Sequence, residues 1–342
     1  IEDSSTYINS QKLVIQEPLE KVQSYAQGKK LTIFLDRDLC DVVAPGQRVR
    51  VSGHYKVRRK SKSSTTFDSY IEAVYLEWLE KDLSDLTITD EELRQIKELA
   101  KDPKLFEKLI DSIAPSIYGY PEIKEAISLQ LVGGVPKFMG DGSYIRFNIH
   151  ILLIGDPGIG KSQVLKYVSR LAPKSLYTSG KSASGAGLTA TAKKDSDGAW
   201  VLCAGALVLA SGGLACIDEF EKMRDEDRSF IHEALEQQTV SVAKAGIIAT
   251  LKAETSALAA ANPKYGRFDS YKPLSEQFDL DPPLLSRFDL IFELKDSIEE
   301  EKDKEIAGHI LSGHQGALSK KSGGDEHKPA IERELLRKYI AL

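Results

Sequence analysis

A glycine-rich segment from Gly155 to Ser162 carries the clearest chemical signal in this chain. It contains Gly155, Asp156, Pro157, Gly158, Ile159, Gly160, Lys161 and Ser162 and fits the pattern G-x-x-x-x-G-K-[ST] completely. The glycines let backbone N–H groups fold around phosphates, and the lysine ammonium neutralises them. The serine hydroxyl can ligate Mg²⁺ at the start of a helix whose dipole favours anions. The spacing predicts a loop that binds a nucleoside triphosphate, in which we include the next residue, Gln163.

Two acidic residues, Asp218 and Glu219, follow the apolar run Leu214–Ile217, 57 residues after Lys161. In a nucleotide site the first acid positions Mg²⁺ through water, and the second orients and polarises the attacking water. Paired acids after a strand are otherwise often only the start of a helix. Downstream of a phosphate-binding loop they predict ATP hydrolysis, with Mg²⁺ held by Ser162 and Asp218.

Two further polar residues stand beside apolar strand candidates. Asn262 follows the run 258–261, and its amide could hold the same water or the γ-phosphate, although an Asn-Pro pair is also a common turn starter. Arg287 stands just before the run Leu290–Leu294 and would suit an arginine finger. A lone arginine is usually a surface charge, and only the preceding series of residues favours this role.

Two basic segments are candidates for contact with DNA phosphates. The first is a predicted hairpin tip with Lys56, Arg58, Arg59, Lys60 and Lys62, and the second is an apparent hairpin around Lys244. Basic tips are more often simply solvated, and a phosphate contact there would be sequence-neutral and salt-dependent. The segment Gly180–Gly198 is rich in Gly, Ala, Ser and Lys, a composition that indicates a flexible loop.

The elements that must position these residues fall into two parts. Four β-branched or aromatic runs, Lys12–Gln16, Leu31–Leu35, Arg48–Val57 and Ser69–Leu79, predict a small antiparallel barrel or sandwich over the first ~80 residues. An acidic helical segment follows. Apolar strand candidates at 149–154, 214–217, 257–261 and 290–294 then alternate with helical patterns, which predicts an α/β fold with a parallel sheet covered on both faces. The stretch Ser312–Lys328 indicates a loop, and 330–342 one more helix.

Composition sets limits on the class of protein. The 342 residues are 42% hydrophobic and 28% charged, as in globular proteins. No run approaches the about 20 apolar residues that a bilayer helix needs, and the start lacks a secretory signal, so we expect no membrane association. Three scattered cysteines fit a reducing compartment. The net charge of −5 means that any contact with DNA must come from local basic clusters.

Together these residues resemble the minichromosome maintenance (MCM) replicative helicases of archaeal type, a family of AAA+ ATPases. The resemblance runs from Tyr7 to Ile340, and its most specific stretches are 112–119, 217–223, 231–239 and 285–292. It implies that Lys161 and Ser162 are Walker A, Asp218 and Glu219 Walker B, and Asn262 sensor 1. It also implies that 114–119, with Ile117 and Tyr118, cradles adenine.

The resemblance implies that Arg287 acts on the nucleotide of a neighbouring subunit, as in the hexameric rings of the family, and that Gln238 also faces that nucleotide. Lys244 would be the tip of a hairpin that grips DNA in the ring channel, and Lys56–Lys62 the N-terminal channel hairpin. Gly180–Gly198 would be a helix-2 insert that moves with nucleotide state.

The resemblance also implies a domain plan. Residues 1–82 would be an OB-fold-like domain without the zinc-binding cysteine cluster common in the family, 83–105 a linker, 106–300 the AAA+ core, and 301–342 the start of a helical lid. The family's lid arginine, sensor 2, and its winged helix would lie beyond Leu342.

The resulting hypothesis is an ATP-dependent helicase subunit of a homo-oligomeric, hexameric ring that acts on single- and double-stranded DNA with other replication factors. It would work in the cytoplasm at the nucleoid of an archaeon, or in the nucleus of a eukaryote. A non-catalytic nucleotide-dependent DNA-binding scaffold is the alternative from another class. Another AAA+ remodelling ATPase is a third, which the basic N-terminal barrel disfavours.

Overall fold

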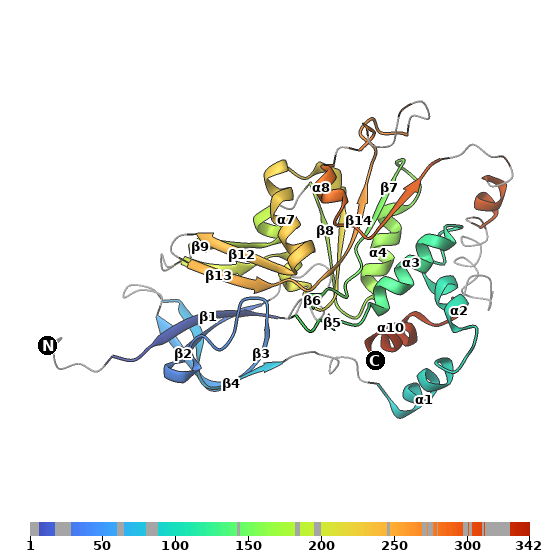
Figure 1. Ribbon diagram of the computed structural model, residues 1–342. Coiled ribbons are helices and arrows are strands. Elements are labelled where there is room, and N and C mark those ends of the chain that lie inside the picture. Colours follow the sequence, from blue (N-terminus) through green and yellow to red (C-terminus); the bar gives the residue numbers. More distant parts are fainter. Residues whose placement is uncertain are drawn as a thin grey trace. The chain divides into compact units, whose positions relative to one another are not determined.

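The computed structural model describes two compact units, residues Ile1–Asp82 and Leu83–Leu342, each considered by itself (Figure 1). Within them the structure describes residues 7–17, 29–59, 65–79, 88–141, 144–181, 185–194, 200–244, 247–268, 272, 276–278, 280–296, 300, 303–309, 311 and 329–342. The expected loop at Ser312–Lys328 lies outside these residues.

The first unit is a four-stranded sheet of β1 (Ser10–Gln16), β2 (Lys30–Asp36), β3 (Arg48–Arg59) and β4 (Phe67–Leu79) in the order β1-β2-β4-β3. Its core is small and centres on Ile33, Leu35 and Leu76. The expectation of a purely antiparallel sheet is wrong at one pair, because β2 and β4 run parallel. The intervening β3 runs opposite to both, so β4 returns in the direction of β2.

The second unit is built on a five-stranded parallel sheet, which confirms the predicted α/β fold. The strands β7 (Ile151–Gly155), β8 (Ser175–Ser179), β11 (Leu214–Asp218), β14 (Ser256–Ala261) and β15 (Leu290–Leu294) take the order β15-β7-β14-β11-β8. Ile151 and Leu153 of β7 pack into one core, while Leu152 and Ile154 pack into the other. A continuous apolar strand therefore covers both faces.

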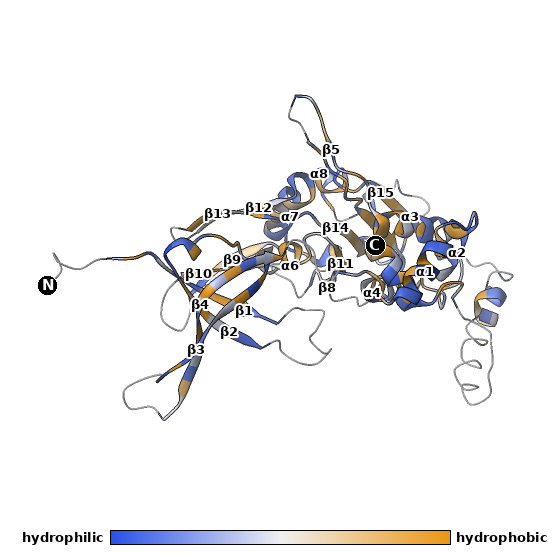
Figure 2. Ribbon diagram, turned by 90° about the horizontal axis from the view of Figure 1, so that it is seen from below, coloured by the Kyte–Doolittle hydropathy of each residue, from blue (hydrophilic) through white to orange (hydrophobic). Residues whose placement is uncertain are grey.

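Helices cover the two faces of this sheet. One core includes residues of α2 (Leu105–Ser112), α3 (Pro121–Val132), α4 (Lys161–Leu171) and α10 (Arg333–Ala341). The other includes residues of α5 (Gly185–Leu188), α6 (Ala206–Leu209), α7 (Asp225–Gln237) and α8 (Pro282–Leu285). Figure 2 shows that α1 (Asp90–Leu99) and α2 carry both hydrophobic and hydrophilic residues, as expected of helices with one packed and one solvated side.

The described part of the second unit also contains three short strand pairs. They are β5 (Lys137–Phe138) with β6 (Tyr144–Ile145), β9 (Ala190–Lys194) with β10 (Trp200–Ala204), and β12 (Thr239–Lys244) with β13 (Ile247–Lys252). The expectation of a flexible loop at Gly180–Gly198 is wrong over α5 and β9, while residues 182–184 and 195–198 of this segment lie outside the described residues. Leu188, Ala190 and Ala192 are buried there, and Leu188 and Ala190 belong to one of the two cores of the unit. Across the described ranges, no helix is long and apolar enough to cross a membrane.

Candidate functional site

The glycine-rich loop joins the end of β7 to the start of α4. Gly158 and Gly160 have φ angles of 93° and 90°, in the left-handed region that favours glycine. At Gly155 the constraint is space, because an added Cβ would lie 2.6 Å from the carbonyl oxygen of Leu294. Each of these glycines therefore has a physical reason in the backbone of the loop.

Asp156 fixes the loop to the segments that follow β14 and β15, the strands on either side of β7. Its Oδ1 accepts a hydrogen bond from the backbone N–H of Phe268 over 2.9 Å, and its Oδ2 accepts one from Asp296 N–H over 3.1 Å. The residue is 6% exposed. A buried carboxylate that satisfies two backbone donors makes the loop rigid.

Lys161 lies at the base of the loop and is buried. Its Nζ donates to the carbonyl oxygens of Gly155 over 2.5 Å and Asp156 over 2.7 Å. Burial lowers the pKa of Lys161, and the charges of Glu221, Asp156 and Asp218 oppose this effect. The ammonium therefore lies within electrostatic reach of the acids at the end of β11. Ser162 follows in the first turn of α4, and Gln163 beside it is exposed.

Asp218 ends β11 and Glu219 follows it, and both acids are held by residues of the adjacent edge strand β8. Asp218 Oδ2 accepts from the Tyr177 hydroxyl over 2.7 Å, while Glu219 Oε2 accepts from the Ser179 hydroxyl over 3.1 Å. Burial and this hydrogen bond raise the pKa of Tyr177. Glu219 also pairs with Lys222, which is the main cause of its lowered pKa. Both catalytic candidates are thereby oriented and Glu219 stays ionised.

Asn262, immediately after β14, reaches a third acid that sequence reasoning missed. Its Nδ2 donates to Glu221 Oε1 over 2.9 Å. In the described part of the chain, Glu221 Oε2 is buried without a hydrogen-bond partner. Phe220–Lys222 forms a 3-10 turn, and Glu221 within it is the largest electrostatic influence on Lys161. The signal in the sequence was the third carboxylate of Asp218-Glu219-Phe220-Glu221.

A mainly apolar pocket adjoins the loop. It is lined by Ala114, Ile117, Tyr120, Ile123, Lys124, Leu153, Ile159, Lys161, Val164 and Leu294. Ile117, predicted to cradle adenine, is among these residues, whereas Tyr118 is not. The Tyr118 hydroxyl instead donates to Glu305 over 2.8 Å, and its ring lies 5.6 Å from the ring of His309. Tyr118 thus contacts the segment 303–309.

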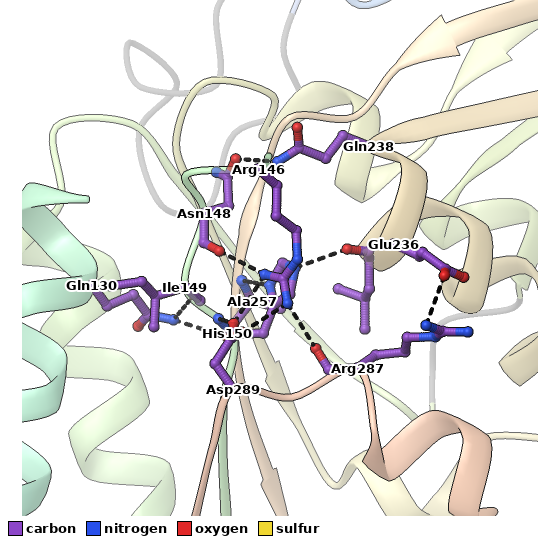
Figure 3. A network of polar contacts seen from close by, with 11 residues as sticks. Gln130, Arg146, Asn148, Ile149, His150, Glu236, Gln238, Ala257, Arg287 and Asp289 are labelled. Atoms are coloured by element: carbon purple, nitrogen blue, oxygen red, sulfur yellow. Dashed lines mark hydrogen bonds and ion pairs between the residues drawn. The ribbon is translucent and has the colours of Figure 1, made fainter. Parts of the chain in front are cut away.

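Arg287 and Gln238 lie near the amino ends of the parallel strands, whereas the glycine-rich loop lies at their carboxyl ends. Arg287 pairs with Glu236 over 2.8 Å, and Gln238 donates from Nε2 to Asn148 Oδ1 (Figure 3). Arg287 precedes β15, which aligns with β7 from Leu290 beside Ile151 to Leu294 beside Gly155. Five residues of strand span about 17 Å. Arg287 therefore cannot join Lys161 and Asp218 within one subunit.

Of the predicted DNA-contacting residues, Lys56, Arg58 and Arg59 lie on β3 and Lys244 lies on β12. Lys56 forms an ion pair with Glu72 over 2.6 Å, which raises its pKa, and Arg59 lies 5.7 Å from the centroid of the Phe67 ring. Arg58 is exposed. Lys60 and Lys62 fall outside the described residues. Lys244 ends β12 opposite Ile247, and its side chain is likewise outside the description.

A rigid glycine-rich loop with a buried lysine, two oriented acids and an amide, all at the carboxyl edge of a parallel sheet, defines a P-loop nucleoside triphosphatase. The family model described as MCM P-loop domain matches residues 92–314, and that described as MCM OB domain matches 1–59. The chain belongs to the MCM helicase family. Its second unit carries the family's nucleotide-binding P-loop ATPase domain, which confirms the resemblance and the fold class predicted from the sequence.

Relatives from two domains of life are similar over the whole chain. The minichromosome maintenance protein MCM of Saccharolobus solfataricus is 49% identical over 346 residues, which cover 100% of this chain and 49% of the relative. DNA replication licensing factor mcm5-A of Xenopus laevis is 41% identical over 354 residues, which cover 100% of this chain and 48% of the relative. DNA replication licensing factor MCM5 of Arabidopsis thaliana is 42% identical over 350 residues, which cover 99% of this chain and 48% of the relative. The chain spans about half the length of these relatives.

Proposed function

We propose that this chain is an ATP-dependent replicative DNA helicase subunit, which couples ATP hydrolysis at the subunit interfaces of a ring to translocation along DNA and unwinding. The observation that carries the proposal is that the catalytic candidates lie at opposite ends of the parallel strands. Lys161, Asp218, Glu219 and Asn262 lie at the carboxyl ends, and Arg287 lies near the amino ends. An ATP site is then completed only when a neighbouring subunit supplies its arginine.

ATP would bind with its phosphates in the loop Gly155–Ser162 and its base against the apolar pocket around Ile117. A magnesium ion fits the residues present. Mg²⁺ prefers one or two protein oxygen ligands together with phosphates and water, and the Ser162 hydroxyl and Asp218 carboxylate supply that type of donor. When bound, the ion neutralises charge on the phosphates.

Glu219 would polarise the attacking water, and Asn262 would orient that water or the γ-phosphate. The hydrogen bond from Ser179 and the ion pair with Lys222 keep the Glu219 carboxylate charged and in a fixed orientation. Glu221 holds the amide of Asn262, so the two sides of the water site are joined through one turn.

Arg287 and Gln238 would act on the nucleotide of the adjacent subunit, which favours a homohexameric ring. Around a channel, the basic residues Lys56, Arg58, Arg59, Lys60, Lys62 and Lys244 would contact single- or double-stranded DNA through phosphates. We also propose the linker at 83–105, the core at 106–300 and the lid from 301. The relatives named for minichromosome maintenance and DNA replication licensing support work with other replication factors at the archaeal nucleoid or, in a eukaryote, in the nucleus.

The test compares ATP turnover of the wild type and Lys161→Ala, with and without single-stranded DNA. Lys166→Ala is the matched control, because Lys166 is an exposed residue on the same helix. We expect turnover stimulated by DNA in the wild type and the control, and its loss in Lys161→Ala. A Lys161→Ala variant that keeps full DNA-stimulated hydrolysis would refute the proposal.

A further inference from the structure

We infer that Arg146 and Asp289 are positioning residues that preset Arg287 for the active site of the neighbouring subunit. This inference rests on the proposed function. Arg146 binds Asp289 with both terminal nitrogens: Nη1 donates to Oδ2 over 2.9 Å and Nη2 donates to Oδ1 over 2.8 Å (Figure 3). The two parallel hydrogen bonds of a bidentate pair fix the orientation of the guanidinium group relative to the carboxylate group.

The pair holds the turn that carries Arg287 from several sides. Arg146 Nη2 also approaches the Arg287 carbonyl oxygen at 3.5 Å, and its Nη1 donates to the Asn148 carbonyl oxygen over 2.6 Å. Asp289 Oδ2 accepts from the backbone N–H of His150 over 2.8 Å, and Asp289 N–H donates to the His150 carbonyl over 2.9 Å. The backbone of 287–289 is therefore bound to residues 146–150.

The Arg287 side chain is held separately by α7. One terminal nitrogen, Nη1, pairs with Glu236 over 2.8 Å, and the side chain remains 32% exposed. Its Nε is buried and makes no hydrogen bond to any residue that the structure describes. The guanidinium is thus anchored at one end while part of it stays accessible to a second subunit.

The same five-residue segment, 146–150, connects this turn to other functional elements. Asn148 accepts the hydrogen bond of Gln238, the other residue proposed to face the neighbour. The His150 ring bridges two elements: Nδ1 accepts from Ala257 N–H over 3.1 Å, and Nε2 lies 3.1 Å from the Leu235 carbonyl. Ala257 belongs to β14, the strand that ends beside Asn262. The segment therefore joins both residues aimed at the neighbour to the strand of the chain's own water site.

A positioning role predicts specific kinetics. Loss of the arginine finger costs about 10³–10⁵ in turnover in related chemistry, and a misplacement of about 1 Å costs about 10². We expect Arg146→Ala to lower kcat by about 10- to 100-fold with little change in KM. Arg146→Lys should restore little of the lost kcat, because lysine cannot form the bidentate pair with Asp289. The double variant Arg146→Ala/Arg287→Ala should be no slower than Arg287→Ala alone.

The deciding experiment mixes full-length subunits of this chain in equal amounts and measures ATP turnover. Arg146→Ala subunits keep an intact loop and lack a positioned finger, while Lys161→Ala subunits lack a working loop and keep the finger. We expect the mixture to regain turnover well above either variant alone, as a parallel mixture of Arg287→Ala with Lys161→Ala should. Arg94→Ala, at an exposed arginine of α1, is the control and should keep wild-type kcat. The thermal midpoint confirms that each variant is folded, and an unchanged nucleotide Kd confirms the intact loop in Arg146→Ala and Arg287→Ala.

The outcomes separate the inference from the function on which it rests. Wild-type kcat in Arg146→Ala overturns the inference. So does an Arg146→Ala variant that loses turnover but is not rescued by Lys161→Ala when Arg287→Ala is rescued, because Arg146 would then act in its own subunit. If Arg287→Ala itself retains full turnover or is not rescued, the arginine finger in trans is wrong, and the proposed function fails together with the inference.

Discussion

The side-chain amide of Asn262 donates a hydrogen bond to Glu221 Oε1 across 2.9 Å, which ties the end of β14 to the acidic turn after β11. The second oxygen of Glu221 is buried without a partner among the described residues, and its charge acts on Lys161. One carboxylate thus connects the residue proposed to sense the γ-phosphate with the lysine proposed to bind it.

Substitution Glu221→Gln should lower kcat and leave the KM for ATP nearly unchanged, because the carbonyl oxygen of the introduced amide can still accept the hydrogen bond of Asn262 but carries no charge beside Lys161. Glu221→Ala should also destabilise the fold by about 1–3 kcal/mol, since the Asn262 amide loses its acceptor. Steady-state ATP hydrolysis and chemical denaturation check both effects. Glu125→Gln, at an exposed position of α3, serves as control; equal kinetics of the two Gln variants would argue against the role of Glu221.

Tyr177→Phe should raise the magnesium concentration that half-maximal ATP turnover requires. The Tyr177 hydroxyl donates to Asp218 Oδ2 over 2.7 Å, and loss of a hydrogen bond to a metal-binding carboxylate typically costs 10- to 100-fold in metal affinity. A titration of ATP hydrolysis with Mg²⁺ should therefore show a higher half-saturating concentration. Tyr265→Phe, at a residue that is 60% exposed, should leave the curve in place. Overlapping curves for all three proteins would contradict the assignment of Asp218.

Substitutions of Asp156 should have graded effects on the phosphate-binding loop. Asp156→Asn retains one acceptor oxygen and should lose one of the two bonds to backbone N–H groups, whereas Asp156→Ala loses both. Each unpaired buried donor costs about 1–3 kcal/mol. The free energy of unfolding and the nucleotide Kd should worsen in the order wild type, Asn, Ala. The exposed Asp303→Ala provides the control, and an unchanged Kd in Asp156→Ala would show that the anchoring is dispensable.

The stability of the second unit should fall in mild acid because of His150. Burial, aided by the charge of Arg146, lowers the pKa of His150 to about 4 from the ordinary 6.5. The unfolded chain gains a proton as the pH falls below 6.5, while the folded chain does not until about pH 4. The contribution to stability is therefore complete above pH 6.5 and declines by about 3 kcal/mol toward pH 4.

Denaturation of the wild type and His150→Gln between pH 7 and 4 measures this effect. The variant should be less stable at pH 7, because its ring contacts are lost, and should show a flatter profile between pH 6.5 and 4. His232→Gln on α7 is the matched control and should follow the wild type. If the free energies of unfolding of wild type and His150→Gln fell in parallel between pH 6.5 and 4, His150 would not be the cause of the acid sensitivity.

The sequence predicts those parts of the site whose determinants are local. The loop Gly155–Ser162 is contiguous, and the strands before Asp218 and Asn262 are continuous apolar runs buried on both faces. By contrast, the edge strand β8 (Ser175–Ser179) is half-buried and polar, so no periodic pattern reveals it. The residues Tyr177 and Ser179 that orient the acids were missed for that reason.

Contacts between distant segments could not be predicted from local patterns. Arg146 and Asp289 are 143 residues apart, and no spacing rule connects them. The parallel pairing of β2 with β4 depends in the same way on chain topology rather than on either strand. In Gly180–Gly198 the small residues suggested a flexible loop, yet burial of Leu188, Ala190 and Ala192 stabilises a helix and a strand.

The central claim is that each ATP site is completed by a neighbouring subunit. The most direct test measures ATP turnover per subunit against protein concentration, with and without single-stranded DNA, while the mass of the assembly is determined in the same samples. We predict that turnover appears together with a ring-sized assembly and rises with DNA. A monomer that hydrolyses ATP at a constant rate, independent of concentration and of DNA, would contradict the account.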